Sequence, residues 1–139
     1  MAITILKQYS VFLANRPGTL KTFADLFVQE CINIIAISQD IRYDSAVMRL
    51  AIDNDSEEIS RAIIKAGFTS VKTDAICLEL DDRMGMIRDV AAVLGAENIN
   101  ISAIYGSTNG PNSRLILVVN DIDKAIDVLE KSKLATTQY

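Results

Sequence analysis

Histidine is absent from this 139-residue chain, and cysteine and proline occur only twice each. Without histidine the chain lacks the commonest general base, and no serine, threonine or cysteine forms a recognisable pair with another base. The two cysteines, Cys31 and Cys77, match no metal-binding or redox spacing, so we interpret both as buried thiols in a reducing compartment. We therefore predict a protein that is not an enzyme, with no catalytic residue, no metal and no cofactor.

Positive charge and long apolar runs are also scarce. The chain has 14 Lys and Arg against 18 Asp and Glu, which gives a net charge of −4. Binding to a phosphate backbone depends on clustered Lys and Arg, so nucleic acid is not an expected partner. No apolar span approaches the roughly twenty residues of a membrane helix, and residues 1–7 lack the apolar core of a signal peptide. We expect a cytoplasmic protein that does not contact a membrane.

The chain does contain an internal repeat, in which one sequence unit occurs twice. The segment Asn15-Arg16-Pro17-Gly18-Thr19-Leu20 returns as Asp82-Arg83-Met84-Gly85-Met86-Ile87. The shift of 67 residues that carries Arg16 onto Arg83 also carries Asn33-Ile34 onto Asn100-Ile101. We therefore predict two domains, residues 1–72 and residues 73–139.

Hydrophobic periodicity predicts the same order of elements in both units, β-α-β-β-α-β. In the first unit the expected elements are a strand at 9–14, a helix from 19 to about 31, strands at 34–37 and 48–52 around a polar turn at 39–45, a helix at 59–66 and a strand at 68–73. In the second they are a strand at 76–80, a helix at 87–94, strands at 99–105 and 114–119, a helix at 122–129 and a short last strand at 135–139.

This order predicts an α+β protein made of two ferredoxin-like βαββαβ units in tandem, each with an antiparallel sheet and both helices on one face. Residues 68–80 contain no Gly or Pro, so the last strand of the first unit should run almost directly into the next unit. The run from Leu115 to Val119 is apolar at every position, which indicates a strand buried on both faces. We expect the second sheet to pack against another subunit in a homodimer.

The two repeated loops are the best candidates for a binding site. The start of a helix presents unpaired backbone N–H groups and partial positive charge, which together hold a carboxylate. Gly18 and Gly85 allow a ligand to approach the main chain closely, and Asn33 or Asn100 offers an amide to an ammonium group. A free amino acid would suit such a site. The alternative is that these residues only form turns and bind nothing.

The motif Arg16-Pro17-Gly18-Thr19-Leu20, followed by Cys31-Ile32-Asn33-Ile34 in βαββαβ order, resembles the ACT domain, and the whole chain resembles a stand-alone tandem-ACT protein. The resemblance implies an amino acid sensor whose ligand lies at an interface between ACT units. The ligand-binding residues that it implies are Asn15, Arg16, Pro17, Gly18, Thr19, Leu20, Asn33 and Ile34 in the first copy, and Asp82, Arg83, Gly85, Met86, Ile87, Asn100 and Ile101 in the second.

Both copies depart from this family pattern at some positions. Met84 stands where the family usually has proline, and Cys31 and Asn98 occupy positions where glycine is common. Asp82 adds a negative charge that would either repel a carboxylate or hold an ammonium group.

Other functions of βαββαβ units find less support. RNA-binding units stack bases on aromatic residues of a central strand, but residues 47–53 and 114–120 contain none. A ferredoxin-like metal carrier would need a Cys-x-x-Cys loop, which the chain lacks. The alternative that remains is a ligand-free oligomerisation or interaction module that acts as a regulatory subunit of a separate amino-acid biosynthetic enzyme.

Overall fold

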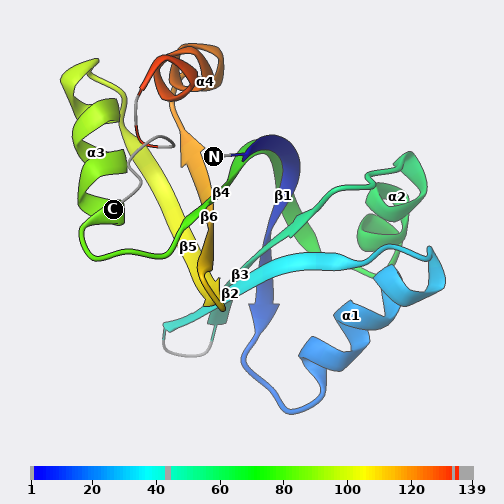
Figure 1. Ribbon diagram of the computed structural model, residues 1–139. Helices are drawn as coiled ribbons and strands as arrows, with labels where there is room; N and C mark the ends of the chain where they lie inside the picture. The colour runs from blue at the N-terminus through cyan, green and yellow to red at the C-terminus, as the bar shows by residue number, and fades with distance from the viewer. Residues whose placement is uncertain (1, 43–44, 133, 135–139) are drawn as a thin grey trace. The chain divides into compact units, whose positions relative to one another are not determined.

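The structure, a computed structural model, describes residues 2–42, 45–132 and 134. Strands and helices alternate along the chain as the sequence predicts, and the α+β class is confirmed (Figure 1). The elements are β1 (Ala2–Ala14), α1 (Thr19–Gln29), β2 (Ile34–Arg42), β3 (Ser45–Ile52), α2 (Glu57–Lys65), β4 (Thr69–Asp81), α3 (Met86–Ala96), β5 (Ile101–Asn109), β6 (Asn112–Val119) and α4 (Ile122–Lys131).

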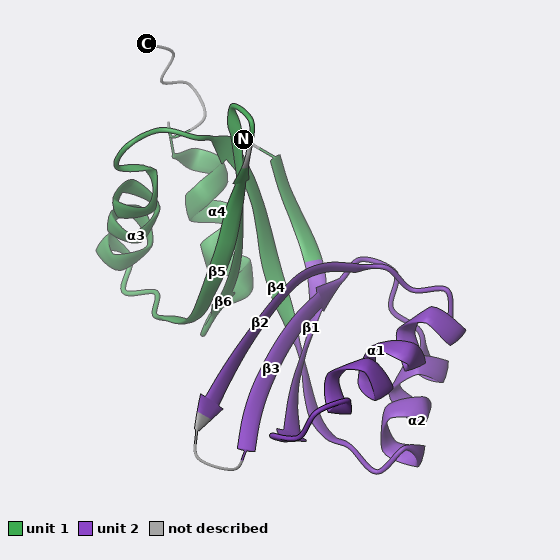
Figure 2. Cartoon of the chain, turned by 90° about the horizontal axis from the view of Figure 1, so that it is seen from below, with its two compact units in different colours: residues 1–5, 74–139 green, residues 6–73 purple. Residues whose placement is uncertain are grey.

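The chain divides into two compact units (Figure 2). One comprises residues 6–73 and is called the first repeat below; the other joins residues 1–5 to residues 74–139 and is called the second repeat. Strand β4 runs without a break from Thr69 to Asp81, which confirms that the last strand of the first unit leads directly into the next.

In the first repeat the hydrogen-bonded strand order is β2-β3-β1-β4. Helices α1 and α2 cover one face of this sheet, and their apolar stripes meet alternate residues of β1 and β3 in a single core. Phe23 and Phe27 of α1 are fully buried there, and their rings lie 5.3 Å apart edge to face. Ile59 and Ile63 make the corresponding buried contacts from α2.

In the second repeat the strand order is β1-β4-β6-β5, and α3 and α4 contribute buried residues to one core with β4 and β6. Val90 and Leu94 of α3 and Ala125 and Leu129 of α4 are fully buried. The strand beside β4 is β1, whose residues 2–5 belong to this unit. The last strand predicted at residues 135–139 lies outside the described residues.

Several predicted boundaries are wrong. Strand β1 begins at Ala2 instead of Tyr9, and β2 continues to Arg42 through the stretch predicted as a polar turn. Because β2 is an edge strand, its polar side chains cost little, and its register with β3 persists from Ile37 opposite Leu50 to Ile41 opposite Ala46.

Strand β6 is buried along its apolar run. Leu115, Ile116 and Leu117 are between 0% and 6% exposed, and Cys77, which lies opposite Ile116 on β4, is 5% exposed. The packing of this sheet against another subunit stays a prediction.

The two cysteines have different environments. Cys77 is buried, as predicted, and burial raises the pKa of its thiol. Cys31 is exposed, so its predicted burial is wrong. The cause is that α1 ends at Gln29, and the chain then turns through Cys31 in the left-handed conformation, with φ of 56°.

Left-handed backbone at Cys31 leads to a prediction on stability. Asn98, the equivalent residue after α3, has φ of 59°. An L-residue in this conformation is strained by about 1–2 kcal/mol. Glycine removes that strain but makes the unfolded chain more flexible, which lowers stability by about 0.5–1 kcal/mol. Cys31→Gly should therefore raise the free energy of unfolding by about 0.5–1 kcal/mol in urea denaturation. Asn98→Gly should change it less, because asparagine tolerates this region; a loss of stability in Cys31→Gly would contradict the account.

A partly buried polar network around Tyr9 holds the start of α2 against the sheet. The Tyr9 hydroxyl donates to Asp55 Oδ1 over 2.6 Å and lies 2.9 Å from Ser60 Oγ. Lys72 Nζ donates to the other Asp55 oxygen over 2.9 Å. Burial raises the pKa of Tyr9, so the hydroxyl keeps the proton that it donates. Partial burial raises the pKa of Asp55, but the hydrogen bonds from Tyr9 and Lys72 outweigh it and hold that pKa below its ordinary value.

This network makes stability depend on pH. A carboxyl whose pKa is lowered by folding stabilises the protein above its unfolded pKa, about 3.9, and loses that contribution as the pH falls through the lower folded value. Tyr9→Phe should cost about 1.5 kcal/mol at pH 7, since it removes a hydrogen bond to a charged group. The difference between Tyr9→Phe and the parent protein should shrink below pH 4 in urea titrations; a difference that is constant with pH would exclude the ionised Asp55 acceptor.

Candidate functional site

The helices that follow the two repeated loops begin differently from the other two. Ser56 and Asp121 cap α2 and α4, each accepting a hydrogen bond from the backbone N–H three residues later. Helices α1 and α3 instead have Gly18 and Gly85 at the N-cap, and no side-chain hydrogen bond among the described residues caps them. The Thr19 and Met86 N–H groups donate to the carbonyls of Arg16 and Arg83 over 3.3 Å. The N–H groups of the next two residues of each helix are left for an acceptor from outside the chain.

Both loop glycines are required by the backbone. Gly18 has φ of 87° and Gly85 has φ of 88°, a region that residues with a Cβ rarely adopt. The two glycines differ in their surroundings. A Cβ added at Gly18 would meet no described atom within 4 Å, whereas one added at Gly85 would lie 3.2 Å from Arg88 Nη2 and 3.9 Å from Arg83 Nη1. Two guanidinium groups therefore stand beside the start of α3.

Both guanidinium groups are held by Asp89. Arg83 Nη2 donates to Asp89 Oδ2 over 2.7 Å, and Arg88 Nε donates to Asp89 Oδ1 over 3.1 Å. The hydrogen bond from Arg83 is the main reason why the pKa of Asp89 is lowered, and the bond from Arg88 adds to it. Since one carboxylate faces two cations, the group keeps an excess of positive charge at the helix start.

A cavity of about 440 Å³ opens beside this loop in the second repeat. Five of the residues predicted for the second copy line it, namely Asp82, Arg83, Gly85, Met86 and Ile87. Its other wall comes from β5 and β6 and includes residues that belong to no motif and were not predicted, among them Ile104, Gly106, Thr108, Ser113 and Leu115. Gly106 was the available signal, because a glycine within a strand often marks a close approach of backbone.

The predicted residues Asn100 and Ile101 are not part of the lining that is described for this cavity. The Asn100 backbone N–H donates to Asn120 Oδ1 over 3.0 Å, and the Asn120 N–H donates to the Asn100 carbonyl over 3.2 Å. These bonds tie the start of β5 to the residue that follows β6.

In the first repeat most of the predicted residues lie at the surface. Asn15, Arg16, Pro17, Gly18, Leu20 and Asn33 are exposed, and Thr19 and Ile34 are half-buried. The carbonyl of Gly18 accepts from the Thr22 hydroxyl over 3.1 Å. Leu20 is 46% exposed, and Ile37 and Ile41 of the edge strand β2 are 49% and 57% exposed.

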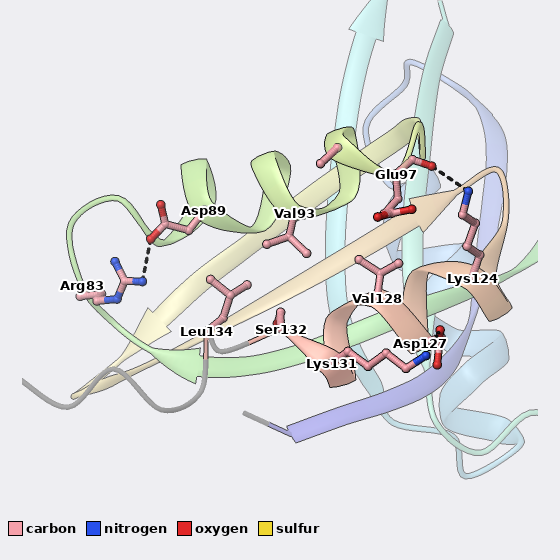
Figure 3. Close-up of a pocket in the computed structure, with 11 residues that line it drawn as sticks. Arg83, Asp89, Val93, Glu97, Lys124, Asp127, Val128, Lys131, Ser132 and Leu134 are labelled. Atoms are coloured by element: carbon pink, nitrogen blue, oxygen red, sulfur yellow. Dashed lines mark hydrogen bonds and ion pairs between the residues drawn. The ribbon is translucent and has the colours of Figure 1, made fainter.

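A second hollow, a groove of about 730 Å³, runs between α3 and α4 (Figure 3). Five of the charged side chains that line it are engaged within the chain: Arg83 binds Asp89 at one end, Lys131 pairs with Asp127 over 2.9 Å, and Lys124 Nζ donates to the Glu97 main-chain carbonyl over 2.8 Å. Arg83 lines both hollows. We assign the candidate site to the smaller cavity, where the uncapped start of α3 faces open space.

Comparison with known proteins places the fold. The sequence profile of the family described as an ACT domain pair matches residues 3–138. A crystal structure of a protein from Bacteroides thetaiotaomicron is 25% identical with a TM-score of 0.84, and the match covers 96% of this chain and 92% of that one. The regulatory subunit of aspartate kinase from Thermus thermophilus is 12% identical with a TM-score of 0.70 over 94% of both chains, which shows a shared fold.

A curated relative is similar over a shorter stretch. The 6-phospho-5-dehydro-2-deoxy-D-gluconate aldolase of Halalkalibacterium halodurans is 32% identical over 73 residues. These residues make up 51% of this chain and 25% of the aldolase. Within the described part of the chain, no helix has the length and apolar character needed to cross a membrane.

Proposed function

Because the chain belongs to the ACT domain pair family, we propose that it binds a free amino acid at the start of α3 and acts as a non-catalytic regulatory protein. The observation that carries this proposal is the cavity of about 440 Å³ lined by Asp82, Arg83, Gly85, Met86 and Ile87. The aldolase similarity is not a reason to propose catalysis, since it covers only a quarter of that enzyme.

The chemistry of the cavity suits a zwitterion. A ligand carboxylate would accept from the N–H groups of Ile87 and Arg88 in the first turn of α3 and from the exposed guanidinium of Arg88, whose side chain is 79% accessible. Asp82, which is exposed and lies at the beginning of the same loop, supplies the negative charge that an ammonium group needs. A ligand with only one of these charges would engage only one of the two protein groups.

We propose that the bound amino acid regulates a separate enzyme. The regulatory subunit of an aspartate kinase shares this fold, and we propose that this chain likewise serves as a regulatory subunit, for an enzyme of amino-acid biosynthesis. The alternative, an interaction module without a ligand, is favoured by the exposed apolar residues Leu20, Ile37 and Ile41 on the first repeat.

We further propose a homodimer in which another copy closes the ligand cavity. Ile87 and Ile104 border that cavity and are 59% and 44% exposed. The first repeat presents Leu20, Ile37 and Ile41 in the equivalent place. Covering such surfaces with a second ACT unit would place the amino acid between units and remove apolar area from water.

The dimer leads to a prediction on mass. Light scattering at micromolar concentration should give twice the chain mass of 15.2 kDa, and Ile41→Asp should shift the protein toward the monomer because it buries a charge in the apolar contact. The matched change Thr108→Asp, at the equivalent position of the second repeat, should have the smaller effect. A monomer mass for the parent protein would rule out the dimer.

Thermal melting against single amino acids tests the proposed function. A ligand at about one hundred times its dissociation constant adds about 2.7 kcal/mol, which raises the melting temperature by about 2–8 °C in a protein of this size. We expect at least one amino acid to produce such a shift. If no amino acid does so at millimolar concentration, the ligand-free interaction module becomes the better description.

A further inference from the structure

The cavity of the second repeat has a polar end beside the hairpin of β5 and β6. Thr108 lies opposite Ser113 in the ladder, and both line the cavity. The Asp82 N–H donates to the Pro111 carbonyl over 2.8 Å, which fixes the loop against the same hairpin. A carboxylate and two hydroxyl groups therefore gather at one end, where they can accept the three hydrogen bonds of an ammonium group.

The other end of the cavity is apolar. Ile104 lies four residues back along β5 from Thr108, about 13 Å away at the usual rise of a strand. Ile87 of α3 borders the same cavity, and Leu115, which lies opposite Gly106, is 6% exposed in its wall. Among the described residues that line the cavity, the charged ones are Asp82, Arg83 and Arg88. All three belong to the loop or to the first turn of α3.

Gly106 lies between the two ends. A Cβ at this position would come within 2.3 Å of the Arg114 carbonyl oxygen and 2.8 Å of Leu115 Cδ2. No side chain fits there unless the strands move, so the middle of the cavity is bounded by bare backbone.

The first repeat offers a built-in comparison at the same register. Its β2–β3 ladder places Ile41 opposite Ala46, where the second repeat has Thr108 opposite Ser113. Gln39 replaces Gly106, and Asn15 replaces Asp82. The first repeat therefore keeps the apolar end, through Leu20 and Ile37, and lacks the carboxylate and both hydroxyls of the polar end.

We infer that each chain binds one amino acid with an aliphatic side chain, and that it binds in the second repeat. This inference rests on the proposed function. The ammonium group lies at Asp82, Thr108 and Ser113, the carboxylate lies at the start of α3 with Arg88, and the side chain extends over Ile87 and Ile104. An acidic or basic side chain would reach an end of the cavity that offers it no countercharge.

Titration calorimetry with four probes, L-leucine, L-aspartate, L-lysine and L-threonine, tests the inference. L-leucine should bind most tightly and with one site per chain. Ile104→Ser should weaken L-leucine by about tenfold or more, since it removes an apolar wall from the ligand side chain. The matched change Ile37→Ser in the first repeat should weaken L-leucine clearly less than Ile104→Ser does, because Ile37 belongs to the proposed dimer contact and does not touch the ligand side chain. Both side chains are exposed enough for the variants to fold.

A second pair of variants tests the polar end. Asp82→Asn should weaken L-leucine by about tenfold or more, because it removes the charge that faces the ammonium group. Asn15→Asp, the reverse change in the first repeat, should leave the affinity and the stoichiometry unchanged.

The outcomes separate the inference from the proposed function. Tighter binding of L-aspartate or L-lysine would overturn the aliphatic ligand while leaving amino acid binding in place. Two sites per chain, or a loss of affinity in Ile37→Ser instead of Ile104→Ser, would overturn the assignment to the second repeat. If all probes and the remaining amino acids fail to bind, the proposed function falls and the inference with it.

Discussion

Gly85→Asp should abolish the rise in melting temperature that L-leucine produces. The new carboxylate would lie where the ligand carboxylate binds, beside two guanidinium groups, since a Cβ at Gly85 is 3.2 Å from Arg88 Nη2. Affinity should fall by about a hundredfold, which corresponds to about 2.7 kcal/mol. The backbone at φ of 88° should add a cost of about 1–2 kcal/mol to folding.

Gly18→Asp is the control for that experiment. Gly18 has almost the same φ, 87°, but a Cβ there meets no described atom within 4 Å. The two variants should therefore lose similar amounts of stability, while only Gly85→Asp loses the response to L-leucine. Loss of the response in Gly18→Asp, with Gly85→Asp still responsive, would place the ligand in the first repeat.

Gly106→Gln should have the largest effect on stability. The substitution copies the residue that the first repeat carries at this register, but its Cβ would lie 2.3 Å from the Arg114 carbonyl oxygen. Separating β5 from β6 to relieve this contact should lower the free energy of unfolding by about 3 kcal/mol. The same change fills the middle of the cavity, so the response to L-leucine should disappear as well.

The reverse substitution, Gln39→Gly, is the control that separates the strain at Gly106 from the general effect of exchanging glycine and glutamine in a strand. Gln39 lies on the edge strand β2 and is exposed, so its removal should cost at most about 1 kcal/mol through the flexibility of glycine. Urea denaturation measures both variants. A Gly106→Gln variant as stable as the parent protein would contradict the close approach of Gly106 to the Arg114 carbonyl oxygen.

The loop before the first helix of each repeat could be predicted from the sequence, because its signals are local. Arg83, Gly85 and Ile87 follow Arg16, Gly18 and Leu20 at one fixed shift, and a glycine before an amphipathic helix indicates a loop with positive φ. The same reasoning found five residues of the cavity wall.

The opposite wall could not be predicted, because it depends on the pairing of two strands. Thr108 and Ser113 become neighbours only through the register of β5 with β6. Strand β5 was predicted to end near Tyr105, where its polar residues begin, but it continues to Asn109, so its last residues were not considered as part of a site. The exposure of Cys31 was missed for a related reason, since the end of α1 at Gln29 lies two residues earlier than its apolar spacing indicates.

The most direct test of amino acid binding is a two-dimensional ¹H–¹⁵N NMR titration of the full chain with L-leucine. The account predicts that the amide signals of residues 85–88 and 104–108 move and saturate together, while those of residues 18–21 and 37–41 stay in place. Shifts confined to the first repeat, or no shift at millimolar L-leucine and at millimolar concentrations of the other amino acids, would contradict it.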